Sequence, residues 1–219
     1  MTKKFVKRAI TLAVLGSLLA FGVVFAQGYG YGWNTSNSTT LTASPEVKAA
    51  LLEALTGPEG EYAAYAMYNA VIDKYGDVEP YVTIREAEAR HITALQRQLD
   101  KYGIDYPTEN PYIGKVEAPD SLEAAAKAWA DGEIANVEMY DRLLAQVPAD
   151  EYPDVVRVFE NLRAASLNAH LPIFQAAAEN GGTLTTEQMQ EIAPQGLAGG
   201  HGSGFGAERG GHGRWSDCE

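Results

Sequence analysis

Apolar side chains recur every three or four residues between residues 45 and 180, and this spacing constrains the fold more than any other feature of the sequence. It places the apolar side chains on one stripe of an α-helix, and no segment alternates in the way typical of a strand. Glycines and prolines mark the ends of the periodic segments. We therefore predict an all-α fold, with a short helix over residues 44–55 and longer helices over residues 58–75, 80–102, 121–146 and 153–180.

The links between the long helices predict how they pack. The first two long helices, and the last two, are joined by short links, so each pair should form an antiparallel hairpin. The link over residues 104–119 is longer, contains three prolines, and could cross the length of a bundle. The prediction is an antiparallel four-helix bundle over residues 44–182, which includes the short N-terminal helix and has one long connection.

The first 26 residues have the layout of a secretory signal peptide. Residues 1–8 carry four basic side chains, residues 9–26 are uncharged and mostly apolar, and Val24-Phe25-Ala26 places small residues at the cleavage positions. We expect cleavage before Gln27 and export to the periplasm, the cell envelope or the medium, with no stable membrane insertion afterwards. An uncleaved anchor is the alternative, because the apolar run is just long enough to cross a bilayer.

The segments that flank the predicted bundle have the composition of flexible chain. Residues 27–43 predict a linker, and residues 183–219, which become rich in Gly and contain His201 and His212, predict a disordered tail. The single cysteine, Cys218, excludes an internal disulfide. A net charge of −12 argues against nucleic acid as a partner and favours cations. Assembly into homo-oligomers is left open.

Five polar side chains interrupt the apolar stripes of the long helices: Glu61, Glu88, His91, Glu133 and His170. No Lys or Arg falls on these stripes, although a buried carboxylate without a partner is strongly destabilising. Glu88 and His91 are three residues apart and so lie on one helix face. Carboxylates and imidazoles that converge from several helices are the ligand set that binds iron or manganese. We predict a metal site at these five residues, with iron as the first choice and manganese as the second.

Other residues near these positions are assigned differently. Glu86, Glu138 and Glu160 fall off the stripes and should be solvated. Tyr65, Tyr68 and Tyr140 are either core residues or electron relays. Pro172 removes a backbone donor close to His170, so we expect a kink or bulge there.

The sequence resembles the ferritin-like superfamily, and residues 46–180 are similar to a prokaryotic ferritin-like family known only as a domain of unknown function. The resemblance is carried by Glu61, Tyr68, Tyr75-Gly76, Glu88-x-x-His91, Asp100 to Ile104, Phe159 to Leu162, Ser166, Asn168 and His170. It implies an antiparallel four-helix bundle with a dinuclear site of iron or manganese, in which Glu61, Glu88 and His91 match the family pattern.

The second half of the sequence departs from this pattern. Leu167 stands three residues before His170, where a Glu is expected, and the spacing from Ser166 to His170 is one residue longer. Glu133 lies one turn before the acids that the family places near Asn136. A dinuclear, mononuclear or degenerate site, or no site, is compatible with these departures.

Two functions are compatible with the sequence. The first is an exported ferritin-like metal-binding protein with a redox or iron-handling role. The alternative is a metal-free helical module of the cell envelope, with a binding or stress role, in which Glu88, His91 and Glu133 form a hydrogen-bonded network. The sequence does not assign a catalysed reaction.

Overall fold

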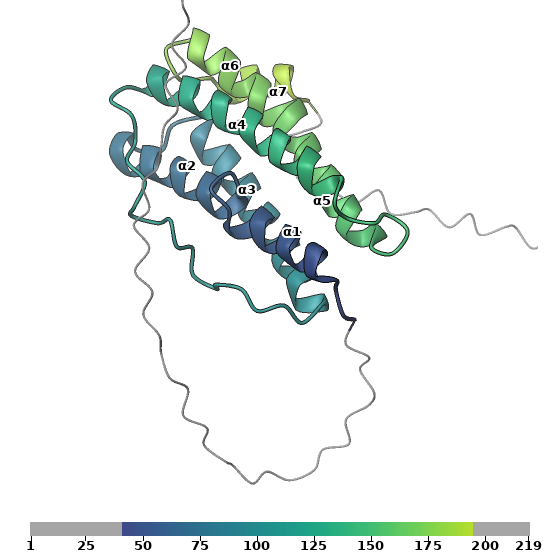
Figure 1. The fold of residues 1–219 in the computed structure, drawn as a ribbon. Coiled ribbons are helices and arrows are strands. Elements are labelled where there is room, and N and C mark those ends of the chain that lie inside the picture. The colour runs from purple at the N-terminus through teal and green to yellow at the C-terminus, as the bar shows by residue number, and fades with distance from the viewer. Residues whose placement is uncertain (1–40, 195–219) are drawn as a thin grey trace, which may run out of the picture. The chain divides into compact units, whose positions relative to one another are not determined.

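The computed structural model describes residues 41–194, and every regular element in this range is helical (Figure 1). In chain order the elements are α1 (Pro45–Thr56), α2 (Glu61–Tyr75), α3 (Tyr81–Lys101), α4 (Leu122–Leu144), α5 (Pro153–Ala165), the π-helix η1 (Ser166–His170), α6 (Leu171–Glu179) and α7 (Thr186–Ile192). The predicted all-α class is confirmed. The predicted signal peptide, residues 27–40 of the predicted linker and residues 195–219 of the predicted tail lie outside the described residues.

The helix ends follow from local sequence signals. The hydroxyl of Ser44 caps α1 by accepting a hydrogen bond from the Val47 amide, and Ser121 caps α4 in the same way. The sequence placed the start of the first long helix at residue 58, but α2 begins at Glu61, after a turn that contains Gly57 and Gly60. The later start puts the Glu61 carboxylate in the first turn of α2, where the helix dipole favours negative charge.

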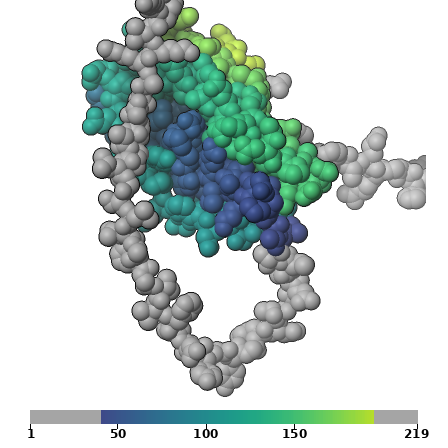
Figure 2. All heavy atoms as spheres, in the orientation of Figure 1, coloured from purple at the N-terminus to yellow at the C-terminus, as the bar shows by residue number. Residues whose placement is uncertain are grey.

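The helices pair largely as the short links predict. α2 packs against α3, and α4 packs against α5, η1 and α6, which follow one another without a break. α1 packs on α3 and α2 and also reaches α4, and Figure 2 shows its purple atoms beside the green atoms of the α4–α5 hairpin. The connection over residues 102–121 spans from the end of α3 to the start of α4, at opposite ends of the helices (Figure 1).

Three tyrosine hydroxyls form hydrogen bonds between the connection over residues 102–121 and the helices. Tyr62 donates to the carbonyl of Pro107 at 2.7 Å, and Tyr75 donates to the carbonyl of Pro119 at 2.6 Å. From the connection itself, Tyr112 donates to the carbonyl of Thr56 at 2.8 Å. The long connection is therefore held at both of its ends and against α1.

Two apolar clusters form the core, and a polar layer lies between them. The first cluster includes Leu51, Leu95, Leu99, Leu143 and Phe159, and the second includes Val71, Ile84, Ala126, Ile173 and Phe174. Each large aliphatic or aromatic side chain that is fully buried contributes about 1.5–3 kcal/mol to stability. Along α3, Glu88 and His91 come between Ile84 of the second cluster and Leu95 of the first. Along α4, Glu133 comes between Ala130 of the second cluster and Met139 of the first. Along the segment from α5 to α6, His170 comes between Leu162 of the first cluster and Ile173 of the second.

The predicted disordered tail begins too early. Residues 183–194 include α7, which starts with a capping box between Thr185 and Gln188. Met189 of α7 and the preceding Leu184 are buried in the second apolar cluster. This segment is ordered because it contributes apolar side chains to the core, and the Gly-rich stretch follows only after it.

Among residues 41–194, no helix combines the length and the apolar character that crossing a membrane requires.

Candidate metal centre

The structure brings all five predicted site residues together in the polar layer. Glu61 comes from α2, Glu88 and His91 from α3, Glu133 from α4 and His170 from η1. Four of them are almost fully buried, with no more than 3% of their surface exposed. The side chain of His91 is 12% exposed. Glu86, Glu138 and Glu160 are exposed, as predicted.

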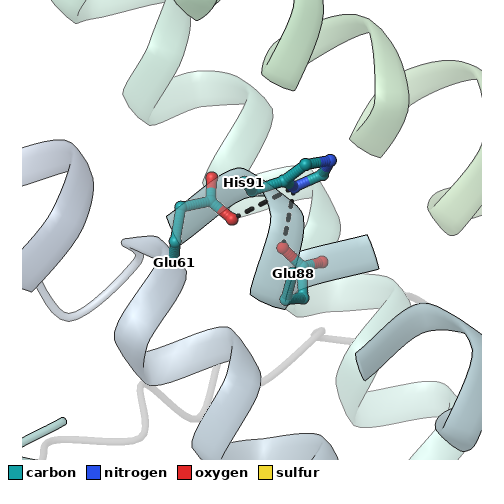
Figure 3. Close-up of side chains that lie close together, drawn as sticks. All are labelled: Glu61, Glu88 and His91. Carbon is teal, nitrogen blue, oxygen red and sulfur yellow. Dashed lines mark hydrogen bonds and ion pairs between the residues drawn. The ribbon is translucent and has the colours of Figure 1, made fainter. Parts of the chain in front are cut away.

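Glu61, Glu88 and His91 form the first group (Figure 3). Nδ1 of His91 lies 2.9 Å from Oε2 of Glu88 and 3.3 Å from Oε2 of Glu61, and both contacts are hydrogen bonds. Figure 3 shows both carboxylates turned toward this nitrogen, while the second ring nitrogen of His91 points away from them. One imidazole therefore joins carboxylates from two helices.

Glu88, Glu133 and His170 form the second group. Nδ1 of His170 lies 3.1 Å from Oε1 of Glu88 and 3.5 Å from Oε1 of Glu133. Neither contact has hydrogen-bond geometry, so this buried nitrogen has no hydrogen-bond partner among the described residues. A buried polar atom without a partner is unusual, because leaving it unpaired costs about 1–3 kcal/mol.

Glu88 belongs to both groups and offers a different oxygen to each, Oε2 to the His91 side and Oε1 to the His170 side. Within each group, one donor atom from every residue lies within 4.8 Å of the others. Ligand atoms on one ion lie a few ångströms apart, and the atoms of each group are gathered at about this spacing. Each group could therefore hold one metal ion, with Glu88 shared between the two.

Two buried tyrosines donate hydrogen bonds to Glu61 and Glu133, the outer carboxylates, which each belong to only one of the two groups. Tyr68 on α2 donates a hydrogen bond to Oε1 of Glu133 on α4, and Tyr140 on α4 donates one to Oε1 of Glu61 on α2. The sequence placed these tyrosines on the buried stripes but did not predict their partners. A signal was present: Glu61 precedes Tyr68 by seven residues, Glu133 precedes Tyr140 by seven, and both tyrosines follow a Met.

The two imidazoles and the carboxylates shift one another's protonation. Burial alone lowers the pKa of His91, but the charge of Glu88 and the contacts with both carboxylates outweigh it and raise the pKa to about 9. Burial likewise lowers the pKa of His170, and the charges of Glu133 and Glu88 raise it to about 10. Protonated imidazoles therefore supply the positive charge that no Lys or Arg on the stripes provides.

The carboxylates shift in opposite directions. Burial, followed by the charge of Glu88, raises the pKa of Glu61 to about 7. Burial also raises the pKa of Glu88, but the charges of His91 and His170 outweigh it and hold this pKa well below its usual range. Glu88 is therefore the fixed negative charge at the middle of the site.

The π-helix η1 sets which residues of the last long helical segment are buried. Its extra residue per turn keeps both Ser166 and His170 buried, whereas Leu167 is 38% exposed. Ser166 donates a hydrogen bond to Asn136 at 2.9 Å, and Asn136 donates to the carbonyl of Glu59 at 2.9 Å. Position 167 therefore carries an exposed Leu and no carboxylate, and a neutral pair, Ser166 and Asn136, is buried beside it. The bulge predicted next to Pro172 is confirmed.

No protein-family model matches the chain, and no curated protein matches its sequence. Among solved structures, the chain is similar to the crystal structure of a hypothetical protein from Methanococcus jannaschii DSM 2661. The two share 23% sequence identity over 73% of this chain and 98% of that chain, with a TM-score of 0.55. At this level of identity the similarity concerns the fold alone.

Proposed function

We propose that this chain is a metal-binding protein with a ferritin-like four-helix bundle, and that the bundle holds a pair of iron ions, or of manganese ions, between its helices. The observation that carries the proposal is the position of Glu88, whose two carboxylate oxygens face two separate Glu–His groups. α2, α3, α4 and the continuous segment α5–η1–α6 are the four helices of this bundle.

The chemistry of the donor set supports iron or manganese. Each ion would be held by one outer carboxylate, one imidazole nitrogen and one oxygen of Glu88, and mixed carboxylate and imidazole ligands suit these metals. The buried Nδ1 of His170, which makes no hydrogen bond and faces oxygens of Glu88 and Glu133, also fits a metal ligand. When bound, such a pair of ions supplies one-electron redox chemistry, which favours a role in redox reactions or iron handling.

The residues of the chain would bind the metal ions, fix the orientation of the ligand side chains and exclude water from the site. Tyr68 donates a hydrogen bond to Glu133, and Tyr140 donates one to Glu61. Hydrogen bonds of this kind to a ligand carboxylate fix the orientation of the ligand. The apolar clusters on both sides of the polar layer keep solvent from the carboxylates. The net charge of −12 attracts cations to the molecule.

Metal analysis of the purified mature chain tests this proposal. We expect about two ions of iron or manganese per chain after reconstitution, and near-complete loss of both in the Glu88→Gln variant, since that residue serves both groups. Glu138→Gln changes an exposed carboxylate on α4 and should leave the metal content unchanged. Wild-type protein that holds no metal after reconstitution rejects the proposal.

We also propose that the protein acts outside the cytoplasm, after cleavage before Gln27. The order of basic residues, apolar run and small residues in positions 1–26 supports this. Expression of the full chain in a bacterial host, followed by cell fractionation and N-terminal sequencing, tests it. A mature chain that begins at Gln27 in the exported fraction is expected, and a full-length chain in the membrane fraction indicates the anchor instead.

One observation favours the metal-free alternative. The first group is already hydrogen-bonded through His91, and the raised pKa values of both imidazoles let them neutralise carboxylates without a metal. In a metal-free envelope module, these hydrogen bonds and ion pairs would by themselves stabilise the buried carboxylates, and no metal ion would replace them. The thermal midpoint separates the two functions, because a metal that binds only the native state raises it and a chelator reverses the rise.

A further inference from the structure

The two groups that share Glu88 are not equivalent in burial. The side chains of His170, Glu88 and Glu133 are 2%, 2% and 4% exposed, whereas the side chain of His91 is 12% exposed. Among the five site residues, His91 has the greatest contact with solvent. An ion that reaches the polar layer therefore meets the His91 group before the His170 group.

The two groups also differ in what an ion must displace. Nδ1 of His91 makes hydrogen bonds to both Glu61 and Glu88, so an ion at this position replaces two existing interactions. Nδ1 of His170 makes no hydrogen bond, although carboxylate oxygens lie 3.1 and 3.5 Å away. An ion there displaces two ion pairs that lack hydrogen-bond geometry, and so gives up less than an ion at His91, which displaces two hydrogen bonds.

From these differences we infer that the His170 group fills first and retains its ion, and that the His91 group is the exchange position through which ions enter and leave. This inference rests on the proposed function and adds the order and mobility of the two ions. Glu88 connects the positions, because one carboxylate oxygen faces each of them. A divalent cation that the protein takes up or hands on therefore occupies the His91 group.

Titration of the metal-free full chain with Mn²⁺ tests the order of filling, with free Mn²⁺ measured by its electron paramagnetic resonance signal. We expect two binding steps whose affinities differ by at least about tenfold, which corresponds to about 1.4 kcal/mol. After loading, a chelator should remove one ion per chain rapidly and the second much more slowly. Two ions that bind with one affinity and leave at one rate overturn the inference.

Matched variants assign the steps to the groups. His91→Ala should bind one Mn²⁺ with the affinity of the first step, whereas His170→Ala should lose that step. Glu61→Gln and Glu133→Gln provide a second pair that preserves side-chain size, and they should behave like His91→Ala and His170→Ala respectively. A first step that survives in Glu133→Gln and disappears in Glu61→Gln reverses the order and overturns the inference.

The outcomes also separate this inference from the proposed function. Wild-type protein that binds no Mn²⁺ and no iron overturns both. Two ions with equal affinity and equal exchange leave the metal-binding function in place and overturn only the inequivalence of the groups.

Discussion

Tyr140 on α4 donates a hydrogen bond of 2.5 Å to Glu61 on α2, and in the opposite direction Tyr68 on α2 donates one to Glu133 on α4. In each helix the Glu and the Tyr are seven residues apart, about two turns, so both face the partner helix. Each of the two helices thus contributes one carboxylate and one phenol. The exchange links the two hairpins through the middle of the core.

The first prediction concerns this link. Tyr140→Phe keeps the ring and removes the hydroxyl, which leaves the buried Glu61 without its donor on α4. We expect the free energy of unfolding of the metal-free protein to fall by about 1–3 kcal/mol, measured by urea denaturation. Tyr65→Phe is the matched control on α2, since Tyr65 is only half-buried, and its effect should stay within about 0.5 kcal/mol. Equal effects of the two substitutions contradict the prediction.

The second prediction is that metal-free protein becomes less stable as pH rises. The folded pKa values of His91 and His170, about 9 and about 10, lie above the unfolded value of 6.5. The stabilisation by the two imidazolium groups is therefore fully present below pH 6.5 and is lost as pH rises through 9 and 10. Each group changes the stability by at most about 1.4 kcal/mol per pH unit.

Glu61 acts in the same direction at lower pH. Its folded pKa of about 7 exceeds the ordinary value of 4.5, so the folded state binds the extra proton between these values. Thermal unfolding of the chelated protein at a series of pH values measures the trend, and His91→Gln should flatten it between pH 6.5 and 9. A midpoint that rises over this interval refutes the assignment.

The third prediction concerns the protons displaced by metal. A metal ion binds the neutral imidazole, so His91 and His170 must each lose a proton that they hold at pH 8. Loading with two ions at pH 8 should release about two protons per chain, and the affinity should increase with pH. Calorimetry in buffers of different ionisation enthalpy measures the number. His170→Gln should lower it by about one, and an affinity independent of pH disproves the linkage.

The fourth prediction tests the register set by the π-helix. Ser166→Leu places a large side chain in the buried space beside Asn136 and should destabilise the protein by about 1–3 kcal/mol or more. Leu167→Ser changes a neighbouring residue that is 38% exposed and should alter the stability by less than about 0.5 kcal/mol. Chemical denaturation compares the two variants. The reverse ranking means that the segment is a regular α-helix.

The sequence predicted the fold well because the buried stripes are long and regular. The stripe of α3, from Ile84 through Glu88 and His91 to Leu99, identifies both the helix and its inward face. Residues 183–192 have only a weak helical pattern and were assigned to the disordered tail, because a seven-residue helix shows less than two full periods. The position of α7 depends on contacts of Met189 that only the tertiary structure creates.

The site residues could be selected from the sequence, but their pairing could not. Spacing puts Glu88 and His91 on one face, yet it does not show which oxygen of Glu88 meets which imidazole. The phenol donors to Glu61 and Glu133 come from helices far away in the chain, so helical period alone does not reveal them. The positive charge of the two imidazoles could not be predicted from the sequence either, because their protonation depends on the folded geometry.

The polar layer divides the buried apolar side chains of the described residues into two clusters. Glu88, Tyr68 and Tyr140 make polar contacts between these clusters, and we expect these contacts to couple the unfolding of the two. If these polar contacts are removed, we expect the two clusters to unfold more independently. Native-state hydrogen exchange would then detect two cooperative units in place of one. Metal binding or protonation at the few carboxylates of the site would thereby control how cooperatively the two clusters unfold.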